Sequence, residues 1–369
     1  MQLPPFKLER YFARYEFSSR YVLCGSDCES MTIGELLSLE PDAEAGFAKQ
    51  WLGYTESPGS PDLRGAIADL YDSIEPGQVL VHAGAEEAIF GFMQAMLQPG
   101  DHVIVHAPCY QSLGALAPAI GCEVSWWAAR EQDGWDPGLE ALRKLVRPHT
   151  RAIILNTPHN PTGYLMPRAE FEAVSDIARE AGALLFSDEV YRESEYDPGT
   201  RLPAACDLGD HAVSLGVMSK TYGLPGLRIG WIATRNEEVR DRMAAAKDYT
   251  TICNAAPSEY LAALALRHRS RLAGRSLAII KDNLAVVEAF LARHASRFSC
   301  VLPRAGSMAF PRYLAGDVET FCDTLVRETG VLLLPGSVYD DDGNHFRLGL
   351  GRLNLPEAMA RLEQFLDRH

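Results

Sequence analysis

Residues 151–191 read RAIILNTPHNPTGYLMPRAEFEAVSDIAREAGALLFSDEVY, and this stretch contains a complete strand–helix–strand unit. Two apolar runs, 151–155 and 183–187, have the length and composition of buried strands. Between them, residues 168–180 have the spacing of a helix. Strands that alternate with helices in this way predict a parallel sheet with helices on its faces.

The same alternation continues on both sides of this unit. Further strands are predicted at 78–82, 102–106 and 212–217, and helices at 61–70, 85–97 and 139–146. After residue 254 the pattern changes to a long helical region at 255–295, short strands near 298–303 and 308–312, a helix at 318–329, a strand at 345–350 and a closing helix at 356–368. We therefore predict an α/β fold whose large domain covers 46–254, with a smaller α+β domain made of 255–369 and the N-terminal segment 1–45.

Composition and charge restrict the function. The chain has 369 residues, enough for both domains, and a formal charge of −14 at pH 7. Nucleic-acid binding usually needs a basic face, so we expect no nucleic-acid partner, although a cationic substrate remains compatible with this charge. No apolar run reaches the length of a membrane span, and the charged start does not resemble a signal peptide, so we expect a cytoplasmic protein. Eight scattered cysteines without zinc-ligand spacing predict reduced thiols and no metal site.

Polar motifs follow three of the predicted strands. They are residues 156–163 (NTPHNPTG), 187–191 (SDEVY) and 219–228 (SKTYGLPGLR). In open α/β sheets, ligands bind at the carboxyl ends of the strands, so we expect these motifs to meet there. Each motif alone has a structural explanation, such as a proline turn or a capping aspartate, but the three in this order indicate a single site.

The three motifs resemble those of the class I/II aminotransferase family, which has the aspartate-aminotransferase-like fold and uses pyridoxal 5′-phosphate. The resemblance covers nearly the whole chain from Tyr54 to the C-terminus. It implies that Lys220 holds the cofactor as a Schiff base and exchanges protons with the substrate, for which the amine must be neutral. Asp188 resembles the carboxylate that pairs with the pyridine nitrogen and makes the ring an electron sink. Tyr191 and Asn160 resemble the pair that binds the ring's phenolic oxygen.

The family resemblance also implies a phosphate-binding group. Gly84, Ala85 and Glu86 open a helix directly after a strand, which directs free backbone N–H groups toward an anion. Arg228 matches the phosphate-binding arginine of the family. The family often has a serine three residues before the lysine, where this chain has Val217, and Ser219 is the residue that can compensate. Glu86 replaces a small polar residue or a lysine, so its carboxylate must point away from the phosphate.

Two tyrosines complete the cofactor site that the resemblance implies. Tyr110 resembles the aromatic residue that stacks on the cofactor ring. Tyr54 resembles the tyrosine that reaches the phosphate of the neighbouring subunit, and this similarity predicts a homodimer with shared active sites.

Arg347 resembles the arginine that binds the α-carboxylate of an amino-acid substrate, for which a planar guanidinium is better suited than lysine. Transamination is the expected reaction, but the shared cofactor also permits elimination, replacement and oxidation. A non-catalytic regulator usually carries a DNA-binding domain in front, for which 45 residues leave little length. A sugar aminotransferase would have no use for Arg347.

The N-terminal segment suggests a narrower substrate. The run 15–17 (YEF) and then Ser26-Asp27 is similar to the segment with which arginine-handling members bind a guanidinium. Those members include capreomycidine synthase-like cyclases and pyridoxal-phosphate arginine oxidases. The alternative prediction is therefore a cyclase or oxidase that acts on arginine or hydroxyarginine, with Glu16 and Asp27 as bidentate partners of the guanidinium. A solvated helix face would explain the same charges.

Overall fold

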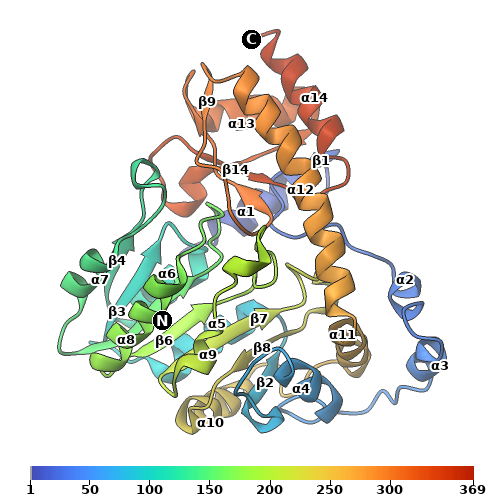
Figure 1. Cartoon of the computed structure of the whole chain (residues 1–369), viewed down its shortest axis with the longest axis vertical. Coiled ribbons are helices and arrows are strands. Elements are labelled where there is room, and N and C mark those ends of the chain that lie inside the picture. Colours follow the sequence, from blue (N-terminus) through green and yellow to red (C-terminus); the bar gives the residue numbers. More distant parts are fainter. Residues whose placement is uncertain (1) are drawn as a thin grey trace.

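A computed structural model describes residues 2–369, and a seven-stranded sheet forms its centre (Figure 1). The strand order is β2-β8-β7-β6-β5-β3-β4. The strands are β2 (Val79–His82), β3 (His102–Ala107), β4 (Glu123–Ala128), β5 (Thr150–Asn156), β6 (Leu184–Asp188), β7 (Ala212–Val217) and β8 (Gly230–Ala233). Strand β8 runs in the direction opposite to the other six strands of this sheet. The predicted α/β fold with a mainly parallel sheet between helices is therefore confirmed.

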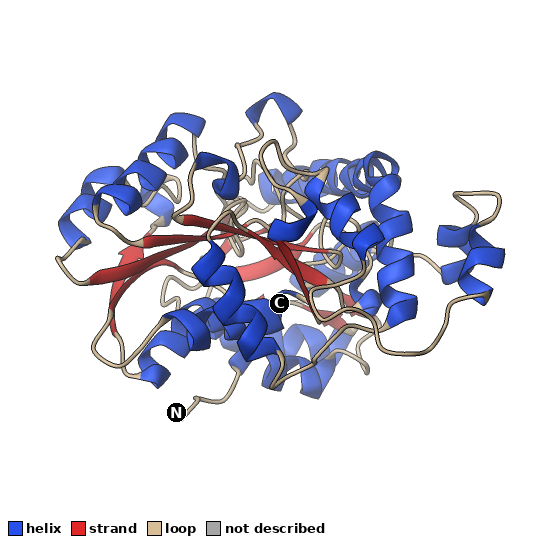
Figure 2. Cartoon of the chain, turned by 90° about the horizontal axis from the view of Figure 1, so that it is seen from below, coloured by secondary structure: helices blue, strands red, loops and turns tan. Residues whose placement is uncertain are grey.

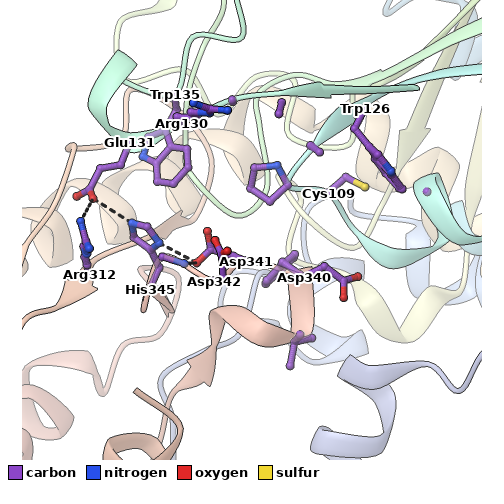
Figure 3. A pocket seen from close by; sticks show the side chains of 18 of the residues that line it. Cys109, Trp126, Arg130, Glu131, Trp135, Arg312, Asp340, Asp341, Asp342 and His345 are labelled. Atoms are coloured by element: carbon purple, nitrogen blue, oxygen red, sulfur yellow. Dashed lines mark hydrogen bonds and ion pairs between the residues drawn. The ribbon is translucent and has the colours of Figure 1, made fainter. Parts of the chain in front are cut away.

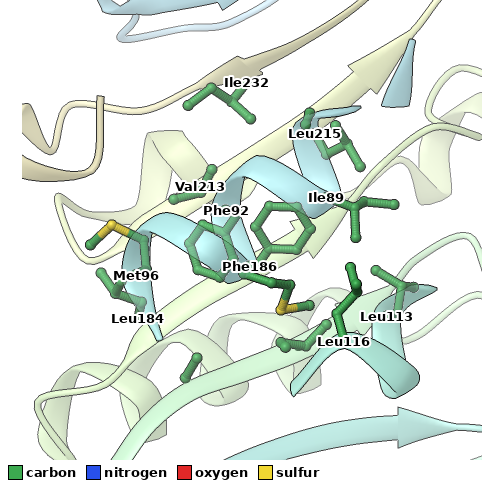
Figure 4. Close-up of a cluster of buried hydrophobic side chains, with 14 of the residues drawn as sticks. Ile89, Phe92, Met96, Leu113, Leu116, Leu184, Phe186, Val213, Leu215 and Ile232 are labelled. Carbon is green, nitrogen blue, oxygen red and sulfur yellow. The ribbon is translucent and has the colours of Figure 1, made fainter. Parts of the chain in front are cut away.

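Helices cover both faces of this sheet, as the view from below shows (Figure 2). They are α4 (Pro61–Ala68), α5 (Ala85–Met96), α6 (Gln111–Ile120), α7 (Leu139–Leu145), α8 (Arg168–Glu180), α9 (Ala205–Leu208), α10 (Glu237–Lys247) and α11 (Ala256–Arg267). One core cluster joins α5, α6 and α10 to the sheet, and there Phe92 of α5 packs on Phe186 of β6 with ring centroids 4.4 Å apart (Figure 4). A second cluster joins α7, α8 and α9 to other side chains of the same strands, including Ile153 and Leu185. The sheet is thus buried on both faces.

A second part of the chain is built on α12 (Arg269–Arg293), which runs away from the sheet toward the C-terminal end of the molecule (Figure 1). Its helices are α13 (Val318–Thr329) and α14 (Leu355–Leu366), and its short strands are β9 (Phe298–Ser299), β10 (Met308–Ala309), β11 (Arg312–Tyr313), β12 (Val331–Leu332), β13 (Leu334–Pro335) and β14 (Phe346–Gly349). Strand β14 lies between β10 and β13, antiparallel to both. Arg347 lies on β14, so this small sheet sets the position of that residue.

The N-terminal segment crosses between the two parts. It contains α1 (Lys7–Tyr15), β1 (Tyr21–Val22), α2 (Ile33–Leu37) and α3 (Ala43–Ala48). Strand β1 pairs with β12. By contrast, Leu36 of α2 and Ala43 of α3 are buried in the cluster that contains α4 and α11. The domain boundaries at 45/46 and 254/255 stay a prediction.

Several predicted elements differ from the observed ones. Strands β4 and β8 and helices α6 and α10 were not predicted. The long helical region expected at 255–295 is two helices, α11 and α12, which meet at His268. None of the helices among residues 2–369 is long and apolar enough to cross a membrane.

Candidate functional site

The ends of β5 and β6 bring the first two motifs together. Asn156 and Asp188 are register partners at the carboxyl ends of these parallel strands. The Asn156 side chain donates to the Asp188 carbonyl at 2.9 Å and accepts from the Asn160 backbone N–H at 2.7 Å. Asn156 therefore fixes the position of the predicted ring-binding residue Asn160 relative to Asp188, a role that sequence reasoning did not assign to it.

Asp188 is a buried carboxylate at this strand end. Its Oδ1 accepts one hydrogen bond from the backbone N–H of Val190, at 3.2 Å. Burial raises the pKa of Asp188 to about 7, although the Val190 bond and the charge of Lys220 act in the opposite direction. The charged form of Asp188 would be stabilised by the protonated ring nitrogen of the predicted cofactor, because such a partner would offset the cost of burying the carboxylate.

Lys220 and Tyr191 face each other after β7 and β6. The Lys220 Nζ lies 5.9 Å from the centroid of the Tyr191 ring. Burial lowers the pKa of the Lys220 ammonium, and Arg347 acts in the same direction, whereas Asp27 and Asp188 oppose them. The net lowering favours the neutral amine that the predicted chemistry needs. The Tyr191 hydroxyl is buried and has no hydrogen-bond partner among the described residues. An unsatisfied buried hydroxyl in this position is a donor available to a ligand.

Arg347 reaches the same place from β14 and is only 1% exposed. Its Nε donates to the carbonyl of Cys24 at 2.9 Å, and its Nη1 donates to Oδ1 of Asn160 at 3.3 Å and to the Tyr339 hydroxyl. Burial opposes the charged form, but Tyr339 and Cys24 more than offset this effect, so the pKa of Arg347 lies above its ordinary value. A buried guanidinium held by hydroxyl, amide and carbonyl groups keeps its charge and can receive a carboxylate.

The turn between β2 and α5 brings together residues predicted to bind a phosphate, Gly84, Ala85 and Arg228, and we call this group the phosphate cup. Gly84 has a φ of +85°, and a Cβ atom there would lie 2.8 Å from Nη2 of Arg228, so the exposed guanidinium lies directly against the turn. Gly230 of β8 allows the strand to approach this turn, because a Cβ there would lie 2.7 Å from the backbone nitrogen of Ala85. The carboxylate of Glu86 accepts from the Ser112 hydroxyl in α6 at 2.6 Å.

Three other residues predicted to bind the cofactor differ in how far they are buried. Ser219 is half-buried directly before Lys220. Tyr110 is half-buried at the start of α6, and its ring lies 5.4 Å from that of Phe6 in the N-terminal segment. Tyr54 is 86% exposed and therefore points away from the interior of its own chain.

The acidic residues of the N-terminal segment differ in their partners. Asp27 forms an ion pair with Arg352 at 2.7 Å, whereas no ion pair to Glu16 within 4.0 Å occurs in the part of the chain that the structure describes. Burial, together with the nearby charges of Glu9 and Asp27, raises the pKa of Glu16. Of the two carboxylates proposed for a guanidinium, Glu16 is thus the one without an ion pair among the described residues, although the charge of Arg352 also lowers its pKa slightly against these effects.

A cavity of about 940 Å³ lies beside the site, where the β4 side of the sheet meets the loop 338–345 (Figure 3). His345 lines this cavity and joins two acidic residues, with its Nδ1 2.8 Å from Asp341 and its Nε2 3.1 Å from Glu131. Tyr339 lines this cavity and also bonds Arg347, so it is the residue that the cavity shares with the site. Across residues 2–369, no three His, Cys, Asp or Glu side chains gather in a way that could hold a metal ion.

Sequence reasoning missed two side chains besides Asn156. Tyr339 donates to Oδ1 of Asn160 at 3.0 Å, and Ser26 accepts from Nζ of Lys220 at 2.8 Å. Ser26 was noticed only as the neighbour of Asp27. No local pattern marks either residue, because both contacts join positions more than 170 residues apart in the chain.

Comparisons with known proteins agree with this geometry. The model of the family described as aminotransferase class I and II matches residues 22–362. Capreomycidine synthase of Streptomyces vinaceus is 31% identical over 376 residues, which cover 100% of this chain and 95% of that protein. A pyridoxal-phosphate-dependent aminotransferase from Streptococcus suis 89-1591 has a TM-score of 0.94 at 35% identity, with 100% of this chain and 99% of that chain covered.

A second solved structure represents a different reaction. The pyridoxal-phosphate-dependent cyclase OrfR has a TM-score of 0.91 at 30% identity, with 100% of this chain and 98% of that chain covered. The predicted aspartate-aminotransferase-like fold and the cofactor, pyridoxal 5′-phosphate, are confirmed by these comparisons. An aminotransferase and a cyclase are thus both similar to this chain over nearly its whole length.

Proposed function

This chain belongs to the aminotransferase class I and II family, and we propose that it transfers the α-amino group of an amino acid by means of a cofactor held on Lys220. It is a pyridoxal-phosphate-dependent enzyme. The observation that carries the proposal is the meeting of Asp188, Tyr191 and Lys220, three groups from the ends of the neighbouring strands β6 and β7 that each suit a different atom of that cofactor.

The residues present fit the cofactor. The unsatisfied Tyr191 hydroxyl and the side-chain nitrogen of Asn160 suit the ring's phenolic oxygen, because the Asn160 oxygen already accepts from Tyr339. Asp188 suits the ring nitrogen, and the Gly84 turn with Arg228 suits the phosphate. When bound, the cofactor supplies an electron sink for negative charge at the α carbon of the substrate.

The protein's own groups then have distinct tasks. Arg347 binds the α-carboxylate and orients the substrate. Asp188 holds a proton on its partner nitrogen through a charge-assisted bond. Lys220, whose lowered pKa favours the neutral amine, takes up a proton at Nζ and returns it.

The second candidate is a cyclase or oxidase that acts on arginine or hydroxyarginine. The free, partly desolvated carboxylate of Glu16 favours a cationic side chain in the substrate. The 31% identity to capreomycidine synthase supports the same branch of the family. Both candidates use the same cofactor site and differ only in what happens after proton removal.

The oligomer we propose is a homodimer with shared active sites. Large apolar side chains are exposed on two adjoining segments, at Trp51, Leu52 and Tyr54 and at Tyr249 and Ile252. The segments are tied together, since Thr55 donates to the carbonyl of Asn254 at 2.9 Å. A second copy would cover this surface and could bring its Tyr54 to the phosphate cup.

The reaction is tested by mixing the cofactor-loaded protein with pyruvate and, in separate samples, arginine, hydroxyarginine, neutral amino acids and acidic amino acids. Transamination forms alanine in equal amount to the amino acid consumed. Consumption of arginine or hydroxyarginine without alanine supports the cyclase or oxidase instead. A protein that consumes no amino acid in any of these samples contradicts both candidates, and the Lys220→Ala variant serves as the inactive control.

A further inference from the structure

The hydroxyl of Ser26 is in direct contact with the proposed catalytic lysine. Ser26 Oγ accepts a hydrogen bond from Lys220 Nζ at 2.8 Å, between residues 194 positions apart in the chain. The Tyr191 ring lies on Lys220 as well, with its centroid 5.9 Å from Nζ. Among the described residues, the Lys220 nitrogen therefore donates to the Ser26 hydroxyl and lies over the Tyr191 ring.

The segment that carries Ser26 is held firmly. The buried Ser307 donates its hydroxyl proton to the Ser26 carbonyl at 2.7 Å, and the Gly349 N–H donates to the Leu23 carbonyl at 2.7 Å. The contact with β14 requires glycine, because a Cβ at Gly349 would lie 2.1 Å from the Gly25 carbonyl oxygen. The backbone of Ser26 is thus held on both sides, which keeps its side chain beside Lys220.

The same segment is also attached to the substrate-binding arginine. The Cys24 carbonyl accepts from Arg347 Nε at 2.9 Å, two residues before Ser26. On the other side, Asp27 is paired with Arg352 at 2.7 Å. Residues 24–27 therefore set the position of the lysine nitrogen relative to the site that would bind the α-carboxylate.

We infer that Ser26 is a positioning residue for Lys220, which accepts a hydrogen bond from Nζ whenever this nitrogen is not bonded to the cofactor. The inference rests on the proposed role of Lys220. In the free state Nζ alternates between amine and ammonium as it takes a proton from the substrate and returns it. Both forms have N–H groups to donate, so the Ser26 oxygen can hold either, while its own O–H bond stays intact.

The bond should favour the ammonium over the amine, since a hydrogen bond from a charged donor is the stronger one. The charged and titratable groups around Lys220 are Asp27, Asp188, Arg347, Cys28 and Tyr191. Of these, Tyr191 also senses the Ser26 hydroxyl, which lowers its pKa, but burial raises the pKa of Tyr191 more strongly, so Tyr191 stays neutral with or without Ser26. Loss of the hydroxyl should therefore lower the pKa of the free Lys220 amine by about half a unit to one unit, the size expected for one such bond.

The first measurement uses the full chain without cofactor. Pyridoxal 5′-phosphate is added, and the rate of the absorbance change is followed against pH for wild type, Ser26→Ala and Ser26→Thr. Only the neutral amine reacts with the aldehyde, so the midpoint of this profile reports the Lys220 amine. We expect Ser26→Ala to shift the midpoint to lower pH and Ser26→Thr, which keeps a hydroxyl, to restore it. The exposed Ser30 gives the matched control, Ser30→Ala.

The second measurement separates binding from proton transfer. With cofactor and amino acid present, Ser26→Ala should lower kcat about tenfold and change KM less than about twofold, because Arg347 still binds the substrate. An unshifted pH midpoint in Ser26→Ala, or equal losses in Ser26→Ala and Ser26→Thr, would overturn the inference. If Lys220→Ala gives the wild-type absorbance change, the proposed role of Lys220 has failed instead.

Discussion

Asp27 and Arg352 form an ion pair at 2.7 Å, and both side chains are largely shielded from solvent. This pair neutralises one of the two carboxylates that the sequence suggested for a substrate guanidinium. Glu16 has no such partner among the described residues, and burial with nearby negative charge raises its pKa. The structure thus makes Glu16 the stronger candidate for contact with a cationic substrate, whereas Asp27 already holds Arg352.

The first prediction follows from this difference. Glu16→Gln should raise KM for arginine at least about tenfold and leave KM for a neutral amino acid nearly unchanged, because it removes a charge-assisted bond that only arginine makes. Asp27→Asn should affect both substrates alike, since it leaves Arg352 unpaired beside the segment that contacts Lys220. Steady-state kinetics with the two substrates measures both effects. Equal effects of Glu16→Gln on both substrates would contradict an arginine site.

Tyr339 provides the second prediction. Its hydroxyl joins Arg347 to Asn160, so Tyr339→Phe removes a bond from each. We expect KM for the amino acid to rise about five- to tenfold, with the absorbance of the bound cofactor little changed, because the loss falls mainly on the carboxylate-binding arginine. Tyr313→Phe, which changes a tyrosine of the small part of the chain away from these bonds, is the control. An unchanged KM would show that Arg347 keeps its position without Tyr339.

The extent to which sequence predicted this structure depends on local pattern. The strand at 212–217 and the helices at 168–180 and 318–329 were predicted with the observed limits, because each has continuous apolar or helical periodicity. Strand β4 was missed because it lies at the sheet edge, where Glu123, Trp126 and Ala128 are exposed and break the apolar run. Strand β8 has four residues, as the predicted strand β2 has, but it begins with Gly230 two residues after the motif 219–228, so its apolar run was not separated from that loop.

In the candidate site, too, only the residues marked by a local sequence pattern could be predicted. Asp188, Lys220 and Asn160 follow strands directly, and the rule that parallel strand ends converge was enough to predict that they meet. Tyr339 and Ser26 come from segments whose positions are set by long-range pairing of β14 with β10 and β13 and by the close approach of Gly25 to Gly349. Such contacts leave no periodic pattern in the sequence.

The third prediction concerns the phosphate cup. Arg228→Ala should raise the Kd for pyridoxal 5′-phosphate by about tenfold or more, because a bidentate arginine is lost from beside the Gly84 turn. Gly84→Ala should have at least as large an effect, since its Cβ would clash with Arg228 and its φ of +85° is strained for alanine. Fluorescence titration of the cofactor-free protein measures both constants. Gly226→Ala in the same loop, where a Cβ meets open space, is the control.

The fourth prediction concerns the exposed apolar surface at 51–54 and 249–252. Leu52→Asp combined with Tyr249→Asp should convert a dimer into a monomer, because charges placed in an apolar interface lose their hydration. Sedimentation equilibrium measures the mass, and far-UV circular dichroism checks that the chain stays folded. If wild type is already a monomer at micromolar concentration, the proposed dimer is wrong.

Asp188 gives the last prediction, in which a change at the cofactor site stabilises the empty protein. In the unfolded chain an aspartate titrates near 3.9, and in the fold the pKa of Asp188 is raised to about 7 by burial. Between these values the folded state binds a proton that the unfolded state has released. The free energy of unfolding therefore falls as pH rises from about 4 to about 7, and it stays lower above that range.

The shift of about three units corresponds to a cost of up to about 4 kcal/mol at pH 8, which Asp188→Asn removes. We expect the cofactor-free Asp188→Asn variant to be a few kcal/mol more stable than wild type in urea at pH 8, with a much smaller difference at pH 5. Addition of pyridoxal 5′-phosphate should reverse the order at pH 8, because only the carboxylate gains a charged partner in the ring nitrogen. A stability difference that does not depend on pH would mean that the carboxylate is not the group that titrates.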